Sequence, residues 1–184
     1  PAVNPTRTYN YTYVTDANYT NRYLRGLLSS ATVTGADGTF TLASVQYDQT
    51  TPAAAASSPL YQHDTANYGT GFNYRGNPTT ITKLGVSSTA TYDVTGALRS
   101  GTGGGTSVQV TPSMNNMVAG VIKPNGDTSM QESVSYNDSL QVTQVQAPNS
   151  ATVSTTFNAA ARPATTTNAH GKVLAYTYDD ANAW

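Results

Sequence analysis

The sequence predicts an all-β fold, in which antiparallel β-hairpin repeats of about 21 residues stack into a curved or spiralling strip. Three observations predict it. An aromatic or large apolar residue followed by Asn or Asp returns at a nearly constant interval through residues 72–184. A turn-forming pair lies midway between successive copies. The run before each copy alternates apolar and polar residues, which is typical of a strand.

The intervals between copies are 20, 22, 22, 21 and 21 residues, counted from Phe72 to Tyr178. Such regularity indicates an internal repeat. The Asn or Asp of each copy is expected to form an Asx turn, often with a Gly a few residues later. The predicted structural repeat positions are Phe72, Tyr92, Asp93, Gly96, Met114, Tyr136, Phe157, Tyr178 and Asp179.

Residues 1–48 are expected to form divergent β repeats at the N-terminus. Tyr9, Tyr11 and Tyr13 alternate with polar residues and therefore share one face of a strand. The segment 35–38, Gly-Ala-Asp-Gly, is a hairpin signal because Gly tolerates positive φ. A second strand then leads to Tyr47-Asp48.

Residues 49–71 break the pattern. They carry two prolines around four consecutive alanines, together with several turn formers. A helix of that length is too short to hold alone. The segment is therefore predicted to be a Pro/Ala-rich loop insertion at the surface.

Residues 72–184 are predicted to hold the regular repeats as one continuous structural unit. The expected mid-unit turns are Leu84-Gly85, Gly103-Gly104-Gly105, Pro124-Asn125-Gly126, Pro148-Asn149-Ser150 and His170-Gly171. The alternation places apolar residues on one face and Ser, Thr and Gln on the other, so we expect a sheet with one buried face. Because the chain ends one turn into a new unit, we expect it to be part of a longer polypeptide.

The composition excludes several classes of function. Charged residues make up 10% and the net charge is −1, so no basic face for nucleic acid is visible. The absence of cysteine rules out disulfides and thiolate zinc sites. No run approaches the 18 apolar residues of a membrane-spanning helix. We expect a secreted or cell-surface protein of a bacterium.

Candidate chemical sites all have a simpler interpretation as turns. The two histidines, His63 and His170, fall on different loops of a quasi-linear repeat, which argues against a shared metal. The Asp16–Asn18 and Asn125–Asp127 segments lack the spacing of a calcium loop. The Gly101–Thr106 segment lacks the lysine and the helix of a phosphate loop. We therefore predict no catalytic, cofactor-binding or metal residues, no cofactor, and no enzymatic activity.

Modification patterns are also present. Asn10, Asn18 and Asn137 begin Asn-X-Ser/Thr triplets. The hydroxyl-rich runs 154–156 and 165–167 are candidates for O-linked sugars in an exported protein, but Thr also suits an exposed strand face. The strand interpretation is the one favoured here.

Several units resemble the Rhs/YD-repeat family, whose copies pair Tyr-Asp with a following Gly and a hydrophobic residue. The matching segments are Tyr92-Asp93-Val94-Thr95-Gly96-Ala97-Leu98, Phe72-Asn73-Tyr74-Arg75-Gly76-Asn77-Pro78, Tyr176-Thr177-Tyr178-Asp179-Asp180-Ala181-Asn182 and Phe157-Asn158-Ala159-Ala160-Ala161-Arg162-Pro163. The last has Ala161 where Gly is usual. The resemblance covers residues 72–184 well and 1–48 loosely. It implies a spiralling antiparallel strip that builds toxin shells or cell-surface proteins in bacteria.

The predicted function is accordingly structural: a YD-repeat scaffold that forms a shell wall or a self-associating filament. Its partners would be other copies or neighbouring repeats of the same polypeptide. One alternative is a surface adhesin that stacks glycans on Tyr9, Tyr11 and Tyr13, for which packing in the core is the favoured competing interpretation. Another is a fragment of a toxin-enclosing Rhs shell, although this segment has far fewer units than such shells use.

Overall fold

The computed structural model describes residues 6–56, 60, 63–114 and 116–179, and within them the chain is all-β. Thirteen strands form one sheet in sequence order, and each strand pairs antiparallel with the next. The strands are β1 Thr8–Tyr13, β2 Leu28–Gly35, β3 Gly38–Tyr47, β4 Pro78–Lys83, β5 Val86–Tyr92, β6 Leu98–Gly103, β7 Thr106–Ser113, β8 Val118–Pro124, β9 Glu132–Tyr136, β10 Val142–Gln146, β11 Thr152–Phe157, β12 Pro163–Thr167 and β13 Val173–Ala175.

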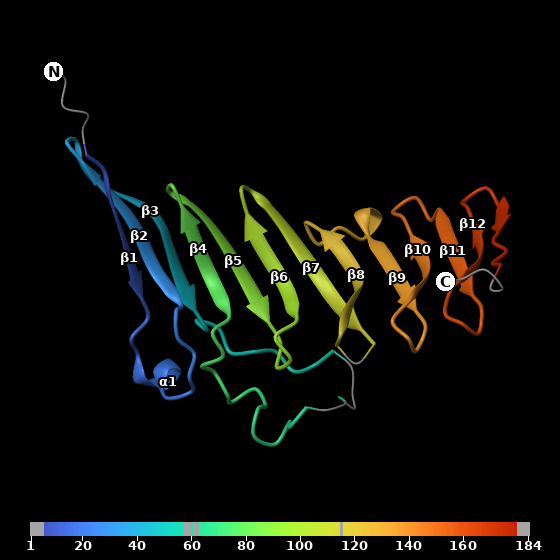
Figure 1. Ribbon diagram of the computed structural model, residues 1–184, viewed down its shortest axis with the longest axis horizontal. Coiled ribbons are helices and arrows are strands. Elements are labelled where there is room, and N and C mark those ends of the chain that lie inside the picture. Colours follow the sequence, from blue (N-terminus) through green and yellow to red (C-terminus); the bar gives the residue numbers. More distant parts are fainter. Residues whose placement is uncertain (1–5, 57–59, 61–62, 115, 180–184) are drawn as a thin grey trace.

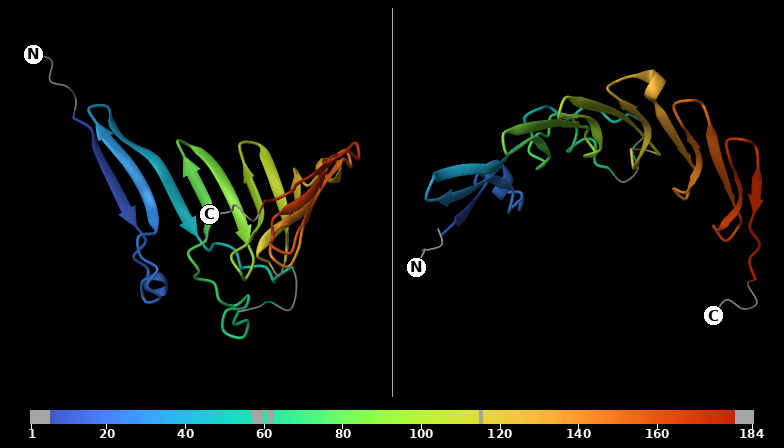
Figure 2. Two further views of the ribbon diagram at one scale, coloured as in Figure 1. Left: turned by 45° about the vertical axis from the view of Figure 1, so that its right-hand side comes forward. Right: turned by 90° about the horizontal axis from the view of Figure 1, so that it is seen from above.

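The sheet is an open strip with free edges at β1 and β13 (Figure 1). Seen from above, the strip bends into an arch, as the twist of neighbouring strands requires (Figure 2). A short helix, α1 (Ala17–Thr20), and the segment between β3 and β4 both lie at the lower ends of the strands in Figure 1. The predicted curved hairpin strip is confirmed.

The upper ends of β4–β5 and β6–β7 turn through two residues, and a turn of the same kind begins the longer connection between β8 and β9. The pairs are Leu84-Gly85, Gly104-Gly105 and Asn125-Gly126, and both members of each have positive φ, as in a type I′ turn. This turn matches the right-handed twist of the strands on either side. The two remaining upper turns in the regular part, 147–151 and 168–172, are longer. All five predicted mid-unit turns thus lie between paired strands.

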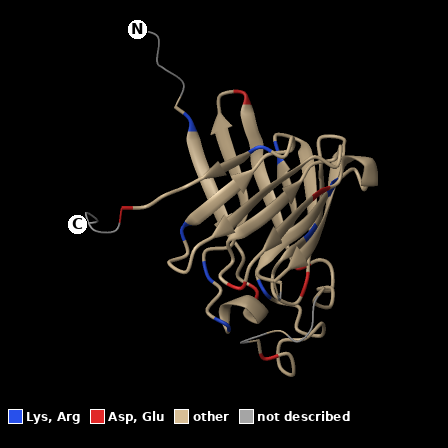
Figure 3. Cartoon of the chain, turned by 90° about the vertical axis from the view of Figure 1, so that its right-hand side faces the viewer, with Lys and Arg blue, Asp and Glu red and all other residues tan. Residues whose placement is uncertain are grey.

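The two faces of the sheet differ as the alternation predicts. Pairs such as Val45↔Ile81, Val110↔Ile122 and Val145↔Val153 lie on the apolar face. Pairs such as Thr89↔Thr102 and Thr156↔Thr165 lie on the other face, where their hydroxyls hydrogen-bond across the strands at 2.6 and 2.7 Å. Lys, Arg, Asp and Glu are sparse over the strands, which are mostly tan in Figure 3.

The expectation that one face would be buried is wrong for the residues that the structure describes. The buried apolar side chains among them are Tyr19, Ala31 and Val94 alone. Core packing of the first tyrosine row is also contradicted: Tyr9, Tyr11 and Tyr13 are 52%, 57% and 52% exposed. The physical reason is that the strip is a single layer, so no second sheet covers the apolar face.

Candidate functional site: the turn end of the strip

A five-residue turn recurs four times between the strands. The side-chain Oδ1 of its first residue accepts hydrogen bonds from the backbone N–H groups two and four residues later, at 2.9–3.2 Å. The backbone N–H of the first residue donates to the carbonyl four residues on. The first residues are Asp93, Asn137, Asn158 and Asn168. The Asx turns predicted at three of these positions are present, and Asn168 adds a fourth.

The fourth residue of each turn has positive φ. The residues are Gly96, Leu140, Ala161 and Gly171, with φ of 81°, 60°, 58° and 71°. Glycine adopts this conformation without cost, whereas Leu and Ala do so at a penalty. The turn 147–151 has the same backbone bonds and a φ of 64° at Ser150, but it begins with Ala147. An Asx residue at the first position therefore adds hydrogen bonds to the turn without being required for it, and a glycine at the fourth makes it less strained.

Tyrosines that precede turns at the lower ends of the strands in Figure 1 hydrogen-bond across their own hairpins. The hydroxyls of Tyr92, Tyr136 and Tyr178 donate to backbone carbonyls at the start of the preceding strand, at 3.1, 2.9 and 2.7 Å. Each is a tyrosine clamp that closes the open end of its own hairpin. Met114 follows β7 and Phe157 ends β11, and neither side chain has a hydroxyl that could form such a bond. Asp179 follows Tyr178 outside any strand.

Tyr47 is the first clamp, and it corrects the predicted position of one repeat. Tyr47 ends β3, and its hydroxyl donates to the carbonyl of Leu28 at 3.0 Å. Phe72, predicted to be the equivalent residue, lies outside the strands, in the segment between β3 and β4. Burial raises the pKa of the Tyr47 and Tyr92 hydroxyls above their usual value, which extends the pH range over which both remain donors.

Asp48 completes a turn that is interrupted by a long insertion. Its carboxylate accepts the backbone N–H groups of Arg75, Gly76 and Asn77 at 2.8, 2.6 and 3.1 Å. Its own N–H donates to the carbonyl of Asn77 at 2.9 Å, and Gly76 has a φ of 80°. These are the bonds of the five-residue turn. Residues 49–73, which we call the inserted segment, occupy the interior of an otherwise ordinary turn.

Arg75 holds the inserted segment by its backbone. Its guanidinium donates to the carbonyls of Phe72, Gly69 and Val94 at 2.8, 3.0 and 2.6 Å, and also to that of Tyr68. Burial lowers the pKa of Arg75, an effect that the negative charge of Asp48 opposes. Nothing in the local sequence pattern of Arg75 predicted this role, because its partners are carbonyls.

The inserted segment also joins the next two lower turns. Ala53 forms a parallel bridge with Asp93, since its N–H donates to Tyr92 and its carbonyl accepts from Val94, both at 2.9 Å. The carboxylate of Asp93 is fully buried and accepts from the Nδ2 of Asn116, with Arg99 Nη1 at 3.7 Å. Asn116 in turn accepts from the N–H of Ala56 at 3.2 Å. Asp93 is therefore a structural anchor as well as a turn residue.

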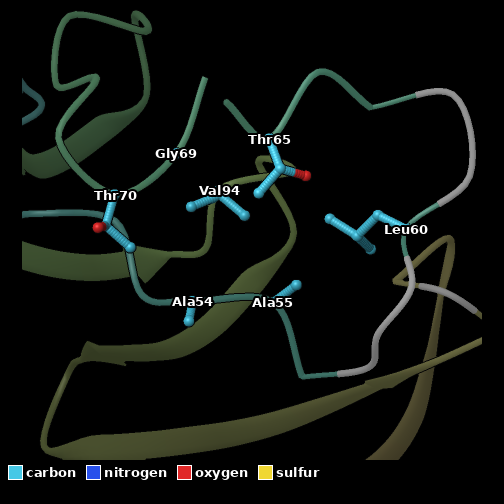
Figure 4. Close-up of a pocket in the computed structure, with 7 residues that line it drawn as sticks. All are labelled: Ala54, Ala55, Leu60, Thr65, Gly69, Thr70 and Val94. Carbon is cyan, nitrogen blue, oxygen red and sulfur yellow. The ribbon is translucent and has the colours of Figure 1, made fainter. Parts of the chain in front are cut away.

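A cavity of about 420 Å³ lies between the inserted segment and Val94 (Figure 4). The side chains that line it are small and mostly apolar: Ala54, Ala55, Leu60, Thr65, Gly69, Thr70 and Val94. His63 links the inserted segment to the turn after β5: its Nε2 lies 3.1 Å from the carbonyl oxygen of Val94, and its Nδ1 lies 3.3 Å from the hydroxyl of Thr65. None of these seven lining residues is charged.

A second cavity, of about 560 Å³, lies where the inserted segment meets the α1 region. The guanidinium of Arg22 stacks over the Phe72 ring at 3.8 Å, and its Nη1 donates to the carbonyl of Tyr74 at 2.7 Å. The Tyr19 and Tyr74 rings meet edge to face at 5.3 Å. We call this the aromatic–arginine pocket; its lining is Asn21, Arg22, Tyr23, Leu24, Tyr68, Phe72, Tyr74 and Arg75.

The remaining candidate residues serve turns. Asp16 accepts from the N–H of Asn18 at the start of α1, and Asp127 accepts from Ser129 at the start of the 3₁₀ helix Thr128–Met130. The bond from Ser129 holds the pKa of Asp127 below its usual value. His170 lies in the turn between β12 and β13. Among the residues described, no group of three or more His, Asp or Glu is placed to hold a metal ion.

In the described part of the chain, no helix has the length and apolar character needed to cross a membrane. The interpretation of segment 101–106 as a hairpin tip is confirmed, since it spans the end of β6, the Gly104-Gly105 turn and the start of β7.

Comparison with known proteins found matches among solved structures alone. No family model and no curated protein matches the chain. The crystal structure of TcdB2-TccC3-Cdc42 is 12% identical with a TM-score of 0.43, and the match covers 94% of this chain and 10% of that one. The Tc holotoxin pore of Photorhabdus luminescens, with a mutated TccC3, is 13% identical with a TM-score of 0.41, covering 94% and 10%. The crystal structure of TcdB2-TccC3 is 13% identical with a TM-score of 0.41, covering 95% and 10%. The chain thus spans about a tenth of each of these chains.

Proposed function

We propose that this chain is a structural β-scaffold of the YD-repeat type, one section of the wall of an extracellular bacterial protein. The observation that carries the proposal is the sheet itself, which has thirteen strands in one open layer with an uncovered apolar face. Such a layer gains stability when further strands or another layer cover its edges and its face. Its function in this proposal is to build surface, and it has no enzymatic activity.

The use of polar side chains supports a structural function. The Asx residues bind backbone N–H groups, the clamp tyrosines bind carbonyls, and Arg75 binds carbonyls of the inserted segment. Asp93, the fully buried acid, is held among Asn116, Thr95 and Arg99. In each case the bond fixes the path of the chain, which is what a wall requires.

The free edges favour association with other copies or with neighbouring repeats. β1 has a hydrogen-bonded partner on one side, in β2, and its residues are exposed. An exposed edge of this kind templates strand addition. We therefore expect the chain to self-associate edge to edge at high concentration, as a filament or an extended wall.

Sedimentation velocity across a concentration series tests this expectation, with electron microscopy of the largest species. The variant Asn10→Lys puts a charge on the edge strand β1, and a charged edge opposes pairing with another strand. The concentration at which the chain assembles should rise at least tenfold, which corresponds to about 1.4 kcal/mol of association free energy. The control Gln144→Lys adds the same charge at an exposed position of the inner strand β10. Monomers at every concentration, or equal effects of the two variants, would contradict edge association.

Two alternatives keep specific support. A cell-surface adhesin that binds glycans is favoured by the exposure of the Tyr9, Tyr11 and Tyr13 row, its first candidate site, and the aromatic–arginine pocket is a second. A section of a toxin-enclosing Rhs shell is favoured by the repeat motifs, such as Tyr92-Asp93 with Gly96. The complete reading frame separates the shell from a filament: many further repeats followed by an unrelated domain would support the shell.

A further inference from the structure

We propose that the aromatic–arginine pocket binds an acidic saccharide, with the sugar ring against exposed aromatic side chains and its carboxylate at Arg22. This goes beyond the scaffold function, and it does not depend on self-association. The pocket belongs to the two lower connections that depart from the five-residue turn, 14–27 and 48–77. Another groove, at β1–β3, also brings aromatic rings and a cation together in Arg7, Tyr9 and Phe40, but its lining includes the acidic Asp37.

The two connections are fixed against each other, so the pocket is preformed. Arg22 stacks on Phe72 and donates to the carbonyl of Tyr74, while Tyr19 packs edge to face on Tyr74. Tyr68 packs edge to face on Phe72, with ring centroids 4.8 Å apart. A volume of about 560 Å³ is within the range of small-molecule sites and accommodates a mono- or disaccharide.

Tyr23 is the residue that points most clearly to a ligand. Its side chain is 84% exposed, and its backbone has a φ of 61°. A bulky residue rarely adopts this left-handed conformation, and such strain tends to occur at binding sites. The left-handed conformation ends α1, since the N–H of Leu24 donates to the carbonyl of Tyr19 at 3.1 Å, but this role requires no exposed aromatic ring. Tyr23 is suited to stack on the apolar face of a sugar ring, with its hydroxyl free to hydrogen-bond.

The charge in the pocket favours an anion. Arg22 is exposed and uses Nη1 on the Tyr74 carbonyl, which leaves the Nε and Nη2 edge of the guanidinium for a ligand. The bond to Tyr74 and the stacking on Phe72 hold that edge in place. Arg75 adds positive charge behind it, and none of the eight lining residues is acidic. A planar guanidinium edge matches a carboxylate in two-point geometry.

The test compares two disaccharides that differ by their carboxylates. Digalacturonic acid and neutral galactobiose are titrated into the chain at low salt, and binding is measured by saturation-transfer NMR and calorimetry. We expect digalacturonic acid to bind at least about tenfold more tightly, since a hydrogen bond to a charged group is roughly twice as strong as one between neutral groups. No binding of either sugar, or equal binding of both, would overturn the proposal.

Variants locate the site. Arg22→Gln should weaken digalacturonic acid binding about tenfold and leave galactobiose unchanged. Tyr23→Asn removes the ring but retains a residue that tolerates positive φ, so binding of both sugars should weaken about fivefold without loss of stability. Tyr9→Asn is the matched control, an exposed tyrosine on β1 away from this pocket. Unchanged binding in Tyr23→Asn, or an equal loss in Tyr9→Asn, would place the saccharide elsewhere and refute the assignment.

Discussion

At the scale of single residues, backbone conformation decides much of this fold. In the part of the chain that the structure describes, nine residues other than glycine have positive φ. Five of them lie where a hairpin turn needs that conformation: Leu84, Asn125, Leu140, Ser150 and Ala161. Since the surrounding hydrogen bonds keep the turn in place, the less suitable residue is tolerated at a cost in stability. These positions are therefore sites where stability can be changed without altering any contact.

The exchange of Ala161 and Gly171 tests this directly, because the two occupy the same position of equivalent turns. Ala161→Gly should stabilise the chain by about 1 kcal/mol, since it removes left-handed strain. Gly171→Ala should destabilise it by about 1 kcal/mol, because open space surrounds Gly171 and strain is the sole cost. Denaturant unfolding followed by circular dichroism measures both. Changes of the same sign in the two variants would contradict the assignment of the turn.

At the scale of elements, the sequence predicted the hairpins well and one of the lower connections poorly. The alternation and the turn pairs located β4–β12 because both signals are local in sequence. Tyr47-Asp48 and Gly76-Asn77 form one turn, yet the inserted segment separates them, so the motif was assigned to Phe72-Asn73 instead. The hydroxyl partners of the clamp tyrosines were equally hidden, because a backbone carbonyl carries no sequence signature.

Excision of residues 49–73 should restore an ordinary turn, since it joins Asp48 to Tyr74-Arg75-Gly76-Asn77. The sheet should persist, because the N–H of Asp48 and the carbonyl of Asn77 are already 2.9 Å apart. Among the residues described, five hydrogen bonds from the inserted segment to residues beyond β4 are lost, and a long loop closure is avoided. The unfolding free energy should therefore change by less than about 3 kcal/mol. Circular dichroism and denaturant unfolding measure the outcome.

The control for the excision variant is removal of residues 74–77, which takes the turn itself and leaves the insertion. This variant should lose the pairing of β3 with β4, because Asp48 loses its three N–H partners. A loss of β-structure in the first variant but not in the second would show that the inserted segment, and not the Asp48 turn, joins the two strands.

At the scale of the whole molecule, the alternation predicted which residues favour burial but not whether this chain would bury them. Val45, Val110 and Val145 lie on the apolar face as expected, yet no second layer covers that face in the part of the chain described. A pattern of hydrophobicity specifies a face and leaves open which polypeptide covers it. The strip therefore depends on neighbouring strands and on the lower-end connections, and its stability should vary along its length.

Hydrogen exchange should reveal this variation. Amides of β3–β7 should exchange more slowly than those of β11–β13, because the inserted segment joins the lower turns of the first group while β13 is a three-residue edge strand. Gly171→Ala should accelerate exchange in β12 and β13 and leave β3–β5 unchanged, since each hairpin contacts only its neighbours. Exchange measured by mass spectrometry after pepsin digestion resolves these segments. Equal acceleration of every strand would mean that the strip unfolds as one cooperative unit, and the quasi-linear account of its stability would fail.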